Sequence, residues 1–273
     1  MWDFEHPPLA AKLAEHYQLH YTVPSRCADE LLAARADLGL IPIASLTPDL
    51  AIVPNCVIAS INHVRSIQLI VRSDRSDPTA ALQSVQSIAA DKASRSSLAY
   101  ADILFRKFLS TSPAFIPCEA DPIAMFQCAD AAILIGDPAL NALEIRPQLE
   151  AAIGHGRHFH WFDLAHEWRT RTGLPWVAAV WAVRPESLSI AHLTPAQLTD
   201  DLTLSRDHGL THIEDLVREW TPRLPLPAET IRYYLTHNIH YSLDPGCIRT
   251  IKLFRRYAAE LEILPPLPDL RFV

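Results

Sequence analysis

Short apolar runs alternate with segments of helical periodicity along most of this chain, and this alternation restricts its fold more than any other feature. The expected strands are residues 18–23, 37–42, 56–60, 67–72, 88–90, 114–117, 131–137 and 176–183. The expected helices are residues 9–16, 25–34, 78–84, 96–110, 121–128, 164–172, 194–208, 213–223, 228–237 and 248–264. Strands that alternate with helices predict an α/β fold with parallel-rich sheets.

Two of these strands, 67–72 and 176–183, bracket a middle block that has strand–helix units of its own. This layout predicts one lobe inserted into another. Lobe 1 would consist of residues 1–70 and 182–273, and lobe 2 of residues 71–181. In open α/β sheets, ligands bind beyond the carboxyl ends of the strands, so we expect a ligand cleft between the two lobes.

A hydroxyl-rich turn follows the strand 88–90 and leads into a helix that we expect to begin near Ser96 or Ser97. Free N–H groups and the positive end of the helix dipole make such a helix start a favourable place for an anion. Ser94 and Arg95 lie in the same turn. The simpler alternative is that Ser96 only caps the helix. A second turn, Gly136-Asp137, also follows a strand and would face the same cleft.

Composition excludes several classes of function. The net charge of −7 argues against nucleic acid or an anionic membrane as the main partner. No run of 18 apolar residues exists to span a bilayer, and the acidic N-terminus does not resemble a signal peptide. The five scattered cysteines predict reduced, mostly buried thiols in a cytoplasmic protein. The chain has no Gly-rich phosphate loop or dinucleotide fingerprint.

Histidines occur in three groups, and none of them matches a metalloenzyme motif. The groups are His155, His158 and His160; His208 and His212; and His237 and His240. Solvated helix faces and a polar loop explain them, so we predict no metal and no cofactor. Serine hydrolase chemistry is disfavoured because no Gly-x-Ser-x-Gly elbow is present. Asp163 is most simply the N-cap of the helix that follows it.

Four stretches, in this order and spacing, resemble one known family. They are Val64-Arg-Ser66 before a strand, Ser94-Arg-Ser-Ser97 at a helix start, Asp130-Ala-Ala-Ile-Leu-Ile-Gly-Asp137, and Asp163-Leu-Ala-His-Glu-Trp168 followed by Thr172-Gly-Leu-Pro-Trp-Val-Ala-Ala-Val-Trp181. Together they resemble the chorismate dehydratases of the futalosine route to menaquinone. The resemblance implies a two-lobed fold like that of type II periplasmic binding proteins, in the cytoplasm, as a monomer or homodimer.

The resemblance also implies that chorismate loses water to give 3-[(1-carboxyvinyl)oxy]benzoate, without any cofactor. Ser94, Ser96 and Ser97 then fit a clamp for a substrate carboxylate, with Ser97 also stabilising developing negative charge. The remaining expected substrate-binding residues are Pro42, Ile43 and Gly136. Arg95 either pairs with the substrate or braces the turn. Asp137 is a candidate catalytic group that takes the leaving hydroxyl or orients a water, or else an N-cap.

No side chain in these motifs is an obvious strong base, so the carboxylate of the substrate itself is a candidate for that role. The sister family, the dihydroxynaphthoate synthases, carries a His-Glu pair where this chain has Gly136-Asp137, and glycine cannot abstract a proton. A cytoplasmic solute-binding protein without catalysis is the other alternative. Family members usually begin with a strand and a substrate-contacting loop that would precede Trp2, beside the strand 38–41. We therefore expect a form extended upstream to be more stable and more active.

Overall fold

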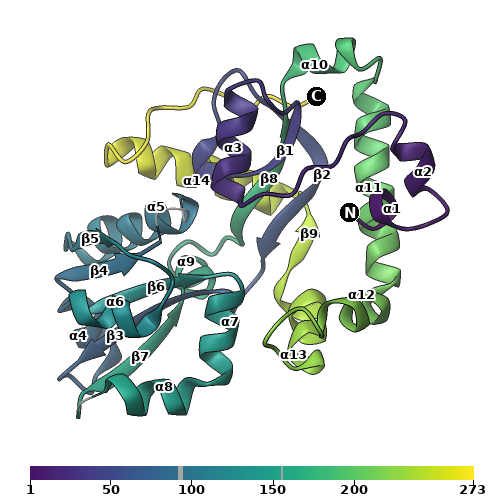
Figure 1. Cartoon of the computed structure of the whole chain (residues 1–273). Coiled ribbons are helices and arrows are strands. Elements are labelled where there is room, and N and C mark those ends of the chain that lie inside the picture. Colours follow the sequence, from purple (N-terminus) through teal and green to yellow (C-terminus); the bar gives the residue numbers. More distant parts are fainter. Residues whose placement is uncertain (92–94, 155) are drawn as a thin grey trace.

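The computed structural model describes residues 1–91, 95–154 and 156–273, which form two lobes, each built on one sheet (Figure 1). The first sheet has the order β1-β8-β2-β9, with β1 Leu38–Pro42, β2 Ala51–Ser60, β8 Trp176–Val183 and β9 His240–Ser242. The second has the order β5-β4-β6-β3-β7, with β3 Ile67–Ser73, β4 Ser87–Ala90, β5 Ala114–Pro117, β6 Ala131–Ile135 and β7 His158–Asp163. The predicted two-lobed α/β architecture is therefore confirmed.

Helices surround both sheets. Those on the side of the first sheet are α1 Trp2–Glu5, α2 Ala10–Leu13, α3 Pro24–Leu32, the 3-10 helix η1 Ile43–Ser45, α10 Pro185–Ile190, α11 Pro195–Thr211, α12 Ile213–Trp220, α13 Ala228–Tyr233, the π-helical turn η3 Tyr234–Asn238 and α14 Pro245–Glu260. Those on the side of the second are α4 Pro78–Gln83, α5 Arg95–Ile103, the π-helical turn η2 Leu104–Leu109, α6 Pro122–Cys128, α7 Asp137–Glu144, α8 Arg146–Ile153 and α9 Leu164–Thr172.

The strand pairing is less parallel than the sequence predicted. Among the described strands, only β4 pairs in parallel, with β5 and with β6, while the other five pairings are antiparallel. The reason lies in the strands beside the two crossings. The chain leaves the first sheet along β2 and returns along β8, so these neighbours run in opposite directions. In the second sheet, the entering strand β3 is likewise antiparallel to β6 and β7.

The two sheets also set where the chain crosses between lobes. Ile67 already pairs with Ile135 in the second sheet, and Trp176 pairs with Ser60 in the first. The crossings therefore lie between β2 and β3 and between α9 and β8, slightly before the predicted boundaries of 70/71 and 181/182. In particular, β8 belongs to the first sheet and not to the inserted lobe, because its apolar residues pair with β1 and β2.

The abundant prolines start helices in this fold. Proline stands at the first or second position of α3, α4, α6, α7, α8, α10, α11 and α14, where its missing N–H costs no intrahelical bond. Side chains cap several of these starts: Asp77, Asp121 and Asp244 accept backbone N–H bonds, and Thr194 forms a capping box with Gln197. Pro24, with Val23 as the N-cap, rather than Ser25, begins α3.

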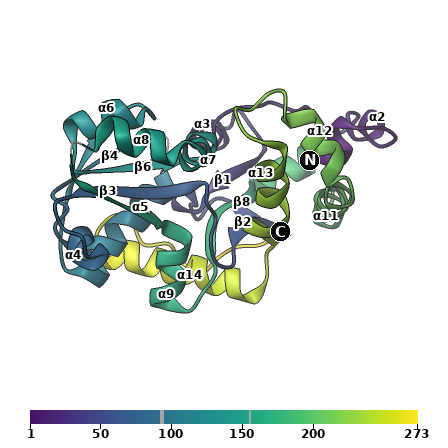
Figure 2. The ribbon, with the colours of Figure 1, turned by 90° about the horizontal axis from the view of Figure 1, so that it is seen from below.

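One hydrophobic core continues through both lobes. It includes Ile41 and Val180 of the first sheet, Leu69 and Ile88 of the second, and Phe254 of α14, all fully buried. Figure 2 shows α14 on the same side of the molecule as α5 and α9, where it contacts α5 and β8. A smaller cluster joins the lobes again, because Leu140 of α7 packs with residues of α12 and α13. The lobes are thus joined by packed side chains as well as by the two crossings.

The predicted strand 18–23 is wrong, because these residues form no strand in the structure. Tyr21 and Val23 are exposed there, so the alternating pattern has no buried face to pair. Instead, Phe4 and Leu13 of α1 and α2 pack near Leu202 of α11. Strand β1 lies at the edge of its sheet. Its other contact is α3, where a Cβ on Gly39 would come within 2.6 Å of the Cys27 sulfur. The lack of a side chain at Gly39 therefore leaves room for the Cys27 sulfur in this contact.

Two further expectations concern the membrane and the thiols. None of the helices in the described ranges has the length and apolar character needed to cross a bilayer. Cys56 and Cys247 are buried as predicted, but Cys128 is exposed and Cys27 and Cys118 are partly exposed. The prediction of mostly buried thiols is therefore wrong for three of the five. All five are free cysteines.

Candidate active site

The first turn of α5 is buried where the two lobes meet. The Ser96 hydroxyl accepts the Ala44 N–H of η1 at 3.3 Å and donates to the Ala178 carbonyl of β8 at 3.3 Å. Because α5 begins at Arg95, Ser96 lies inside the helix, and the interpretation of Ser96 as a simple cap is wrong. Ser97 is 5% exposed, and its hydroxyl has no hydrogen-bond partner among the described residues. Ser96 therefore joins the lobes, whereas the hydroxyl of Ser97 remains available.

The other two members of the predicted turn are Ser94 and Arg95. Ser94 lies outside the described residues. The Arg95 guanidinium donates to both carboxylate oxygens of Asp29 on α3, at 2.8 and 2.9 Å. This ion pair crosses from the second lobe to the first. Of the two roles considered for Arg95, the geometry favours bracing the turn.

The start of α7 presents its groups to solvent. Gly136 is its N-cap, with a φ of 64°, a conformation that favours glycine. The Gly136 N–H donates to the Ser66 carbonyl at 2.7 Å, which holds this turn against the connection between the lobes. Asp137 is the first helical residue, is exposed, and makes no capping bond with its side chain. The alternative that Asp137 is an N-cap is therefore wrong, and its carboxylate is not used in forming the helix.

The hydroxyl groups of Ser66 and Tyr234 lie beside the α7 turn. No sequence pattern predicted that these two groups would meet. The Tyr234 hydroxyl of η3 donates to the Ser66 hydroxyl at 3.0 Å. Burial raises the pKa of Tyr234, the Ser66 bond partly offsets this, and the charges of Asp137 and Asp163 raise it further. Tyr234 therefore stays protonated around neutral pH. Ser66 belonged to a recognised motif, but Tyr234 lay in an ordinary helical pattern that gave no signal.

Asp163 fastens the first crossing, between β2 and β3, to the start of α9. It caps α9 as predicted, accepting the N–H groups of Ala165 and His166 at 3.0 and 3.2 Å. Its carboxylate also accepts the N–H groups of Val64 and Arg65, at 3.3 and 2.7 Å, from the connection that precedes Ser66. Because buried carboxylates need such donors, Asp163 fixes the backbone on which Ser66 sits.

Pro42 and Ile43, the remaining predicted ligand contacts, lie at the end of β1 and the start of η1. Both are buried, and the Ile43 side chain is fully enclosed in the shared core. Their side chains therefore position η1, whose next residue, Ala44, bonds to Ser96.

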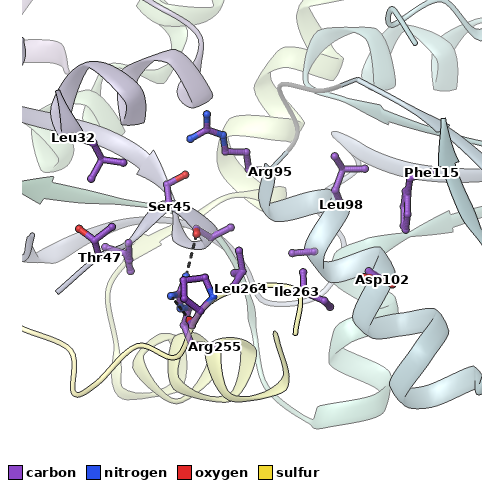
Figure 3. Close-up of a pocket in the computed structure, with 14 residues that line it drawn as sticks. Leu32, Ser45, Thr47, Arg95, Leu98, Asp102, Phe115, Arg255, Ile263 and Leu264 are labelled. Carbon is purple, nitrogen blue, oxygen red and sulfur yellow. Dashed lines mark hydrogen bonds between the residues drawn. The ribbon is translucent and has the colours of Figure 1, made fainter. Parts of the chain in front are cut away.

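A pocket of about 550 Å³ opens on the outer side of α5 (Figure 3). Arg95, Leu98 and Asp102 line it from α5, and Arg255 lines it from α14. Its described lining includes neither the two buried serines of α5 nor the Gly136-Asp137 turn. Of the residues that the sequence predicted to hold a substrate, Arg95 does line this pocket, and its guanidinium is paired there with Asp29.

One group of potential metal ligands comes together among the described residues, namely His240, Asp244 and Cys247. The Asp244 carboxylate is already engaged there, with the His240 ring at 2.9 Å and the Cys247 N–H at 2.8 Å. Burial, and then the charge of Asp244, raise the pKa of the Cys247 thiol to about 12, so it is protonated near neutral pH. In the described structure, the three residues form the capped start of α14, with Asp244 as its N-cap.

Comparison with known proteins supports the fold and the family. A family model described as menaquinone biosynthesis matches residues 3–260. A chorismate dehydratase of Thermus thermophilus is 24% identical over 238 residues, which are 84% of this chain and 82% of that protein. A solved structure from Archaeoglobus fulgidus, 12% identical, has a TM-score of 0.66 and covers 96% of this chain and 94% of its own. The periplasmic aliphatic sulphonate binding protein of Escherichia coli, 14% identical, has a TM-score of 0.61 and covers 93% and 82%. The periplasmic-binding-protein-like fold is thus confirmed.

Proposed function

Because the chain belongs to the menaquinone biosynthesis family, we propose that it is a chorismate dehydratase, a carbon–oxygen lyase of the futalosine route. The observation that carries the proposal is the match along most of the chain to a relative of that name. The hydroxyl of Ser97, which has no partner among the described residues, and the exposed carboxylate of Asp137 support it, because each lies at a helix start after a strand. The same proposal places the protein in the cytoplasm, as a monomer or homodimer.

The reaction removes a proton from the ring carbon that carries the ether and hydroxide from the neighbouring carbon. The two combine as water, and the ring becomes aromatic, which supplies the driving force. The protein must therefore hold two carboxylates and assist departure of the hydroxyl. Ser97 and the N–H groups of the first turn of α5 would bind one carboxylate, with Ser94 completing that clamp, whereas the hydroxyl of Ser96 is engaged between the lobes. Gly136 would approach the substrate with its backbone.

Asp137 and the Ser66–Tyr234 pair would act on the leaving hydroxyl. Tyr234 is protonated near neutral pH because its pKa is raised, chiefly by burial, so it is a hydrogen-bond donor. Asp137, exposed beside it, would orient the water that forms. The base that takes the ring proton would be the carboxylate of the enolpyruvyl group of the substrate, which lies next to that carbon. Oriented donors such as the hydroxyls of Tyr234 and Ser66 would stabilise the negative charge that develops on the leaving oxygen in the transition state.

The experiment is to mix the protein with chorismate, after dialysis against a chelator, and to separate the products by chromatography. We expect 3-[(1-carboxyvinyl)oxy]benzoate to accumulate at a rate proportional to protein concentration. The variant Asp137→Asn should reduce kcat more than it changes KM, because the group acts on the leaving hydroxyl. The proposal would be contradicted if product formed only after metal was added. It would also be contradicted if no product formed although the wild-type protein was shown to be folded.

A second candidate function is solute binding without catalysis. The similarity to a periplasmic sulphonate binding protein favours it, as does the commitment of Ser96 and Arg95 to contacts between the lobes. The same assay separates the two functions, since this alternative requires chorismate to bind in calorimetry and to be recovered unchanged. A third, the sister dihydroxynaphthoate synthase activity, requires a catalytic histidine where this chain has Gly136.

A further inference from the structure

We propose that the pocket on the outer side of α5 is a second ligand site, which binds a small organic carboxylate with an apolar body. We call it the outer pocket; its key residues are Ser45, Thr47, Leu98, Phe115 and Arg255. It lies outside the groups assigned to catalysis, and the inference does not depend on which reaction the protein performs.

The charge of the outer pocket is positive at one place. Arg255 is only 5% exposed and donates to two backbone carbonyls, Ala44 at 3.0 Å and Pro265 at 3.1 Å. It forms no ion pair with a carboxylate among the described residues. The other charged groups of the lining are engaged, Arg95 with Asp29 and Asp102 with Arg106. A buried cation without an anion is costly, and an anionic ligand would compensate it.

Hydroxyl groups beside Arg255 also lack partners. The Ser45 and Thr47 hydroxyls and the Nε atom of Arg255 are buried and have no hydrogen-bond partner within the described part of the chain. All three residues line the same pocket. Buried polar atoms are normally hydrogen-bonded, and a carboxylate offers acceptors to two or three donors at once. This grouping therefore favours a carboxylate over a neutral ligand.

Apart from Arg95 and Asp102, whose charges are paired, the rest of the lining is apolar. In Figure 3, Ser45 and Thr47 lie toward the first lobe, Leu98 and Phe115 toward the second, and Ile263 and Leu264 lie between them. A volume of about 550 Å³ is within the usual range for a small-molecule site. A ligand with its carboxylate near Arg255 would therefore lay an apolar ring or chain against α5 and β5.

Such a ligand would touch both lobes and also reach the α5 start indirectly. Ser45 and Thr47 lie one and three residues after Ala44 in the chain, and the Ala44 N–H donates to the Ser96 hydroxyl. Occupation of the outer pocket would thus favour the arrangement of the lobes that is described here. Ligands shift such an equilibrium only through differential binding, which contact with two lobes provides.

The test is calorimetric titration of the intact protein with benzoate as the probe, and with benzamide as its neutral isostere. We expect benzoate to bind and benzamide to bind at least ~10-fold more weakly, since bonds to a charged group contribute more than neutral ones. Arg255→Met should weaken benzoate binding by ~10- to ~100-fold, the equivalent of one or two charge-assisted bonds. Leu98→Trp, which fills the apolar side, should abolish binding without touching the cation.

Arg72→Met is the matched control. Arg72 also donates to two backbone carbonyls, those of Ile153 and Phe126, and its Nε atom also lacks a partner among the described residues, but Arg72 does not line the outer pocket. Benzoate binding should be unchanged in this variant and in Ser97→Ala. The proposal is overturned if benzoate does not bind, if Leu98→Trp leaves binding intact, or if Ser97→Ala abolishes it, because the carboxylate would then occupy the proposed active site. The calorimeter measures benzoate binding and not turnover. A negative result for the outer pocket can therefore be distinguished from a lack of dehydratase activity.

Discussion

The starts of α5 and α7 each follow a strand of the second sheet, yet they are held in opposite ways. The first turn of α5 is buried and is bonded across the lobes, through Ser96 to Ala44 and Ala178. The first turn of α7 is exposed at Asp137, and only the backbone of Gly136 ties it down, to Ser66. Two similar sequence features thus serve different purposes. The α5 turn fixes how the lobes meet, and the α7 turn keeps its charged group free.

This contrast changes which residues are expected to meet a ligand. Within the hydroxyl-rich turn, neighbouring serines differ, since Ser96 has its bonds already made and Ser97 has none among the described residues. Substitution of one serine should therefore affect stability, and substitution of the other should affect activity.

Ser97→Ala should lower kcat/KM for chorismate by ~10- to ~100-fold while the free energy of unfolding stays nearly unchanged. A hydrogen bond to a charged group contributes about 1.5–3 kcal/mol, and the Ser97 hydroxyl has no partner in the described structure to lose. Steady-state kinetics and urea unfolding on the same preparation measure both quantities. Ser84→Ala is the control, because its hydroxyl bonds only within α4. Full activity in Ser97→Ala would remove this residue from the site.

Ser96→Ala should reduce the free energy of unfolding by about 1–3 kcal/mol, the cost of leaving a buried donor unsatisfied. The donor is the Ala44 N–H, and the Ala178 carbonyl loses its bond as well. Ser97→Ala is the matched control, since it removes a hydroxyl from a residue of the same turn that is buried to the same extent. If urea unfolding gives the same loss for both variants, the contrast between the two serines is not real.

The sequence predicted the fold more fully than the site, for physical reasons. Alternating apolar runs, proline helix starts and acidic caps are local, so the lobes, the main strands and the Asp163 cap could be recognised. Strand direction beside the crossings is not local, and five antiparallel pairings were missed. Likewise, Tyr234 meets Ser66 only because distant segments are brought together. No pattern in the sequence could indicate that Ser96 bonds across lobes.

The ion pair between Arg95 and Asp29 separates bracing from substrate binding. Its side chains are 37% and 54% exposed, so we expect only about 0.2–1 kcal/mol from it, and less at high salt. Arg95→Gln and Asp29→Asn should lower stability by similar small amounts and should not be additive in the double variant. KM for chorismate should stay unchanged in both. A raised KM in Arg95→Gln but not in Asp29→Asn would show that Arg95 binds the substrate.

The smallest expected effect concerns the charge that the α7 turn leaves free. Burial is the main cause that raises the pKa of Tyr234, and the charge of Asp137 adds to it. Asp137→Asn should therefore lower this pKa part of the way toward its usual value of about 10. The contribution of the protonated tyrosine to stability is fully present below that value and is lost as the pH rises through the folded pKa. In Asp137→Asn this alkaline loss should begin at the same pH, but it should end at a lower pH and be smaller in total. Tyrosinate absorbance, with Tyr234→Phe as the blank, measures the pKa, and Asp121→Asn, at the α6 cap, is the control. A pKa that stays the same or rises in Asp137→Asn would mean that Asp137 does not act on this hydroxyl pair.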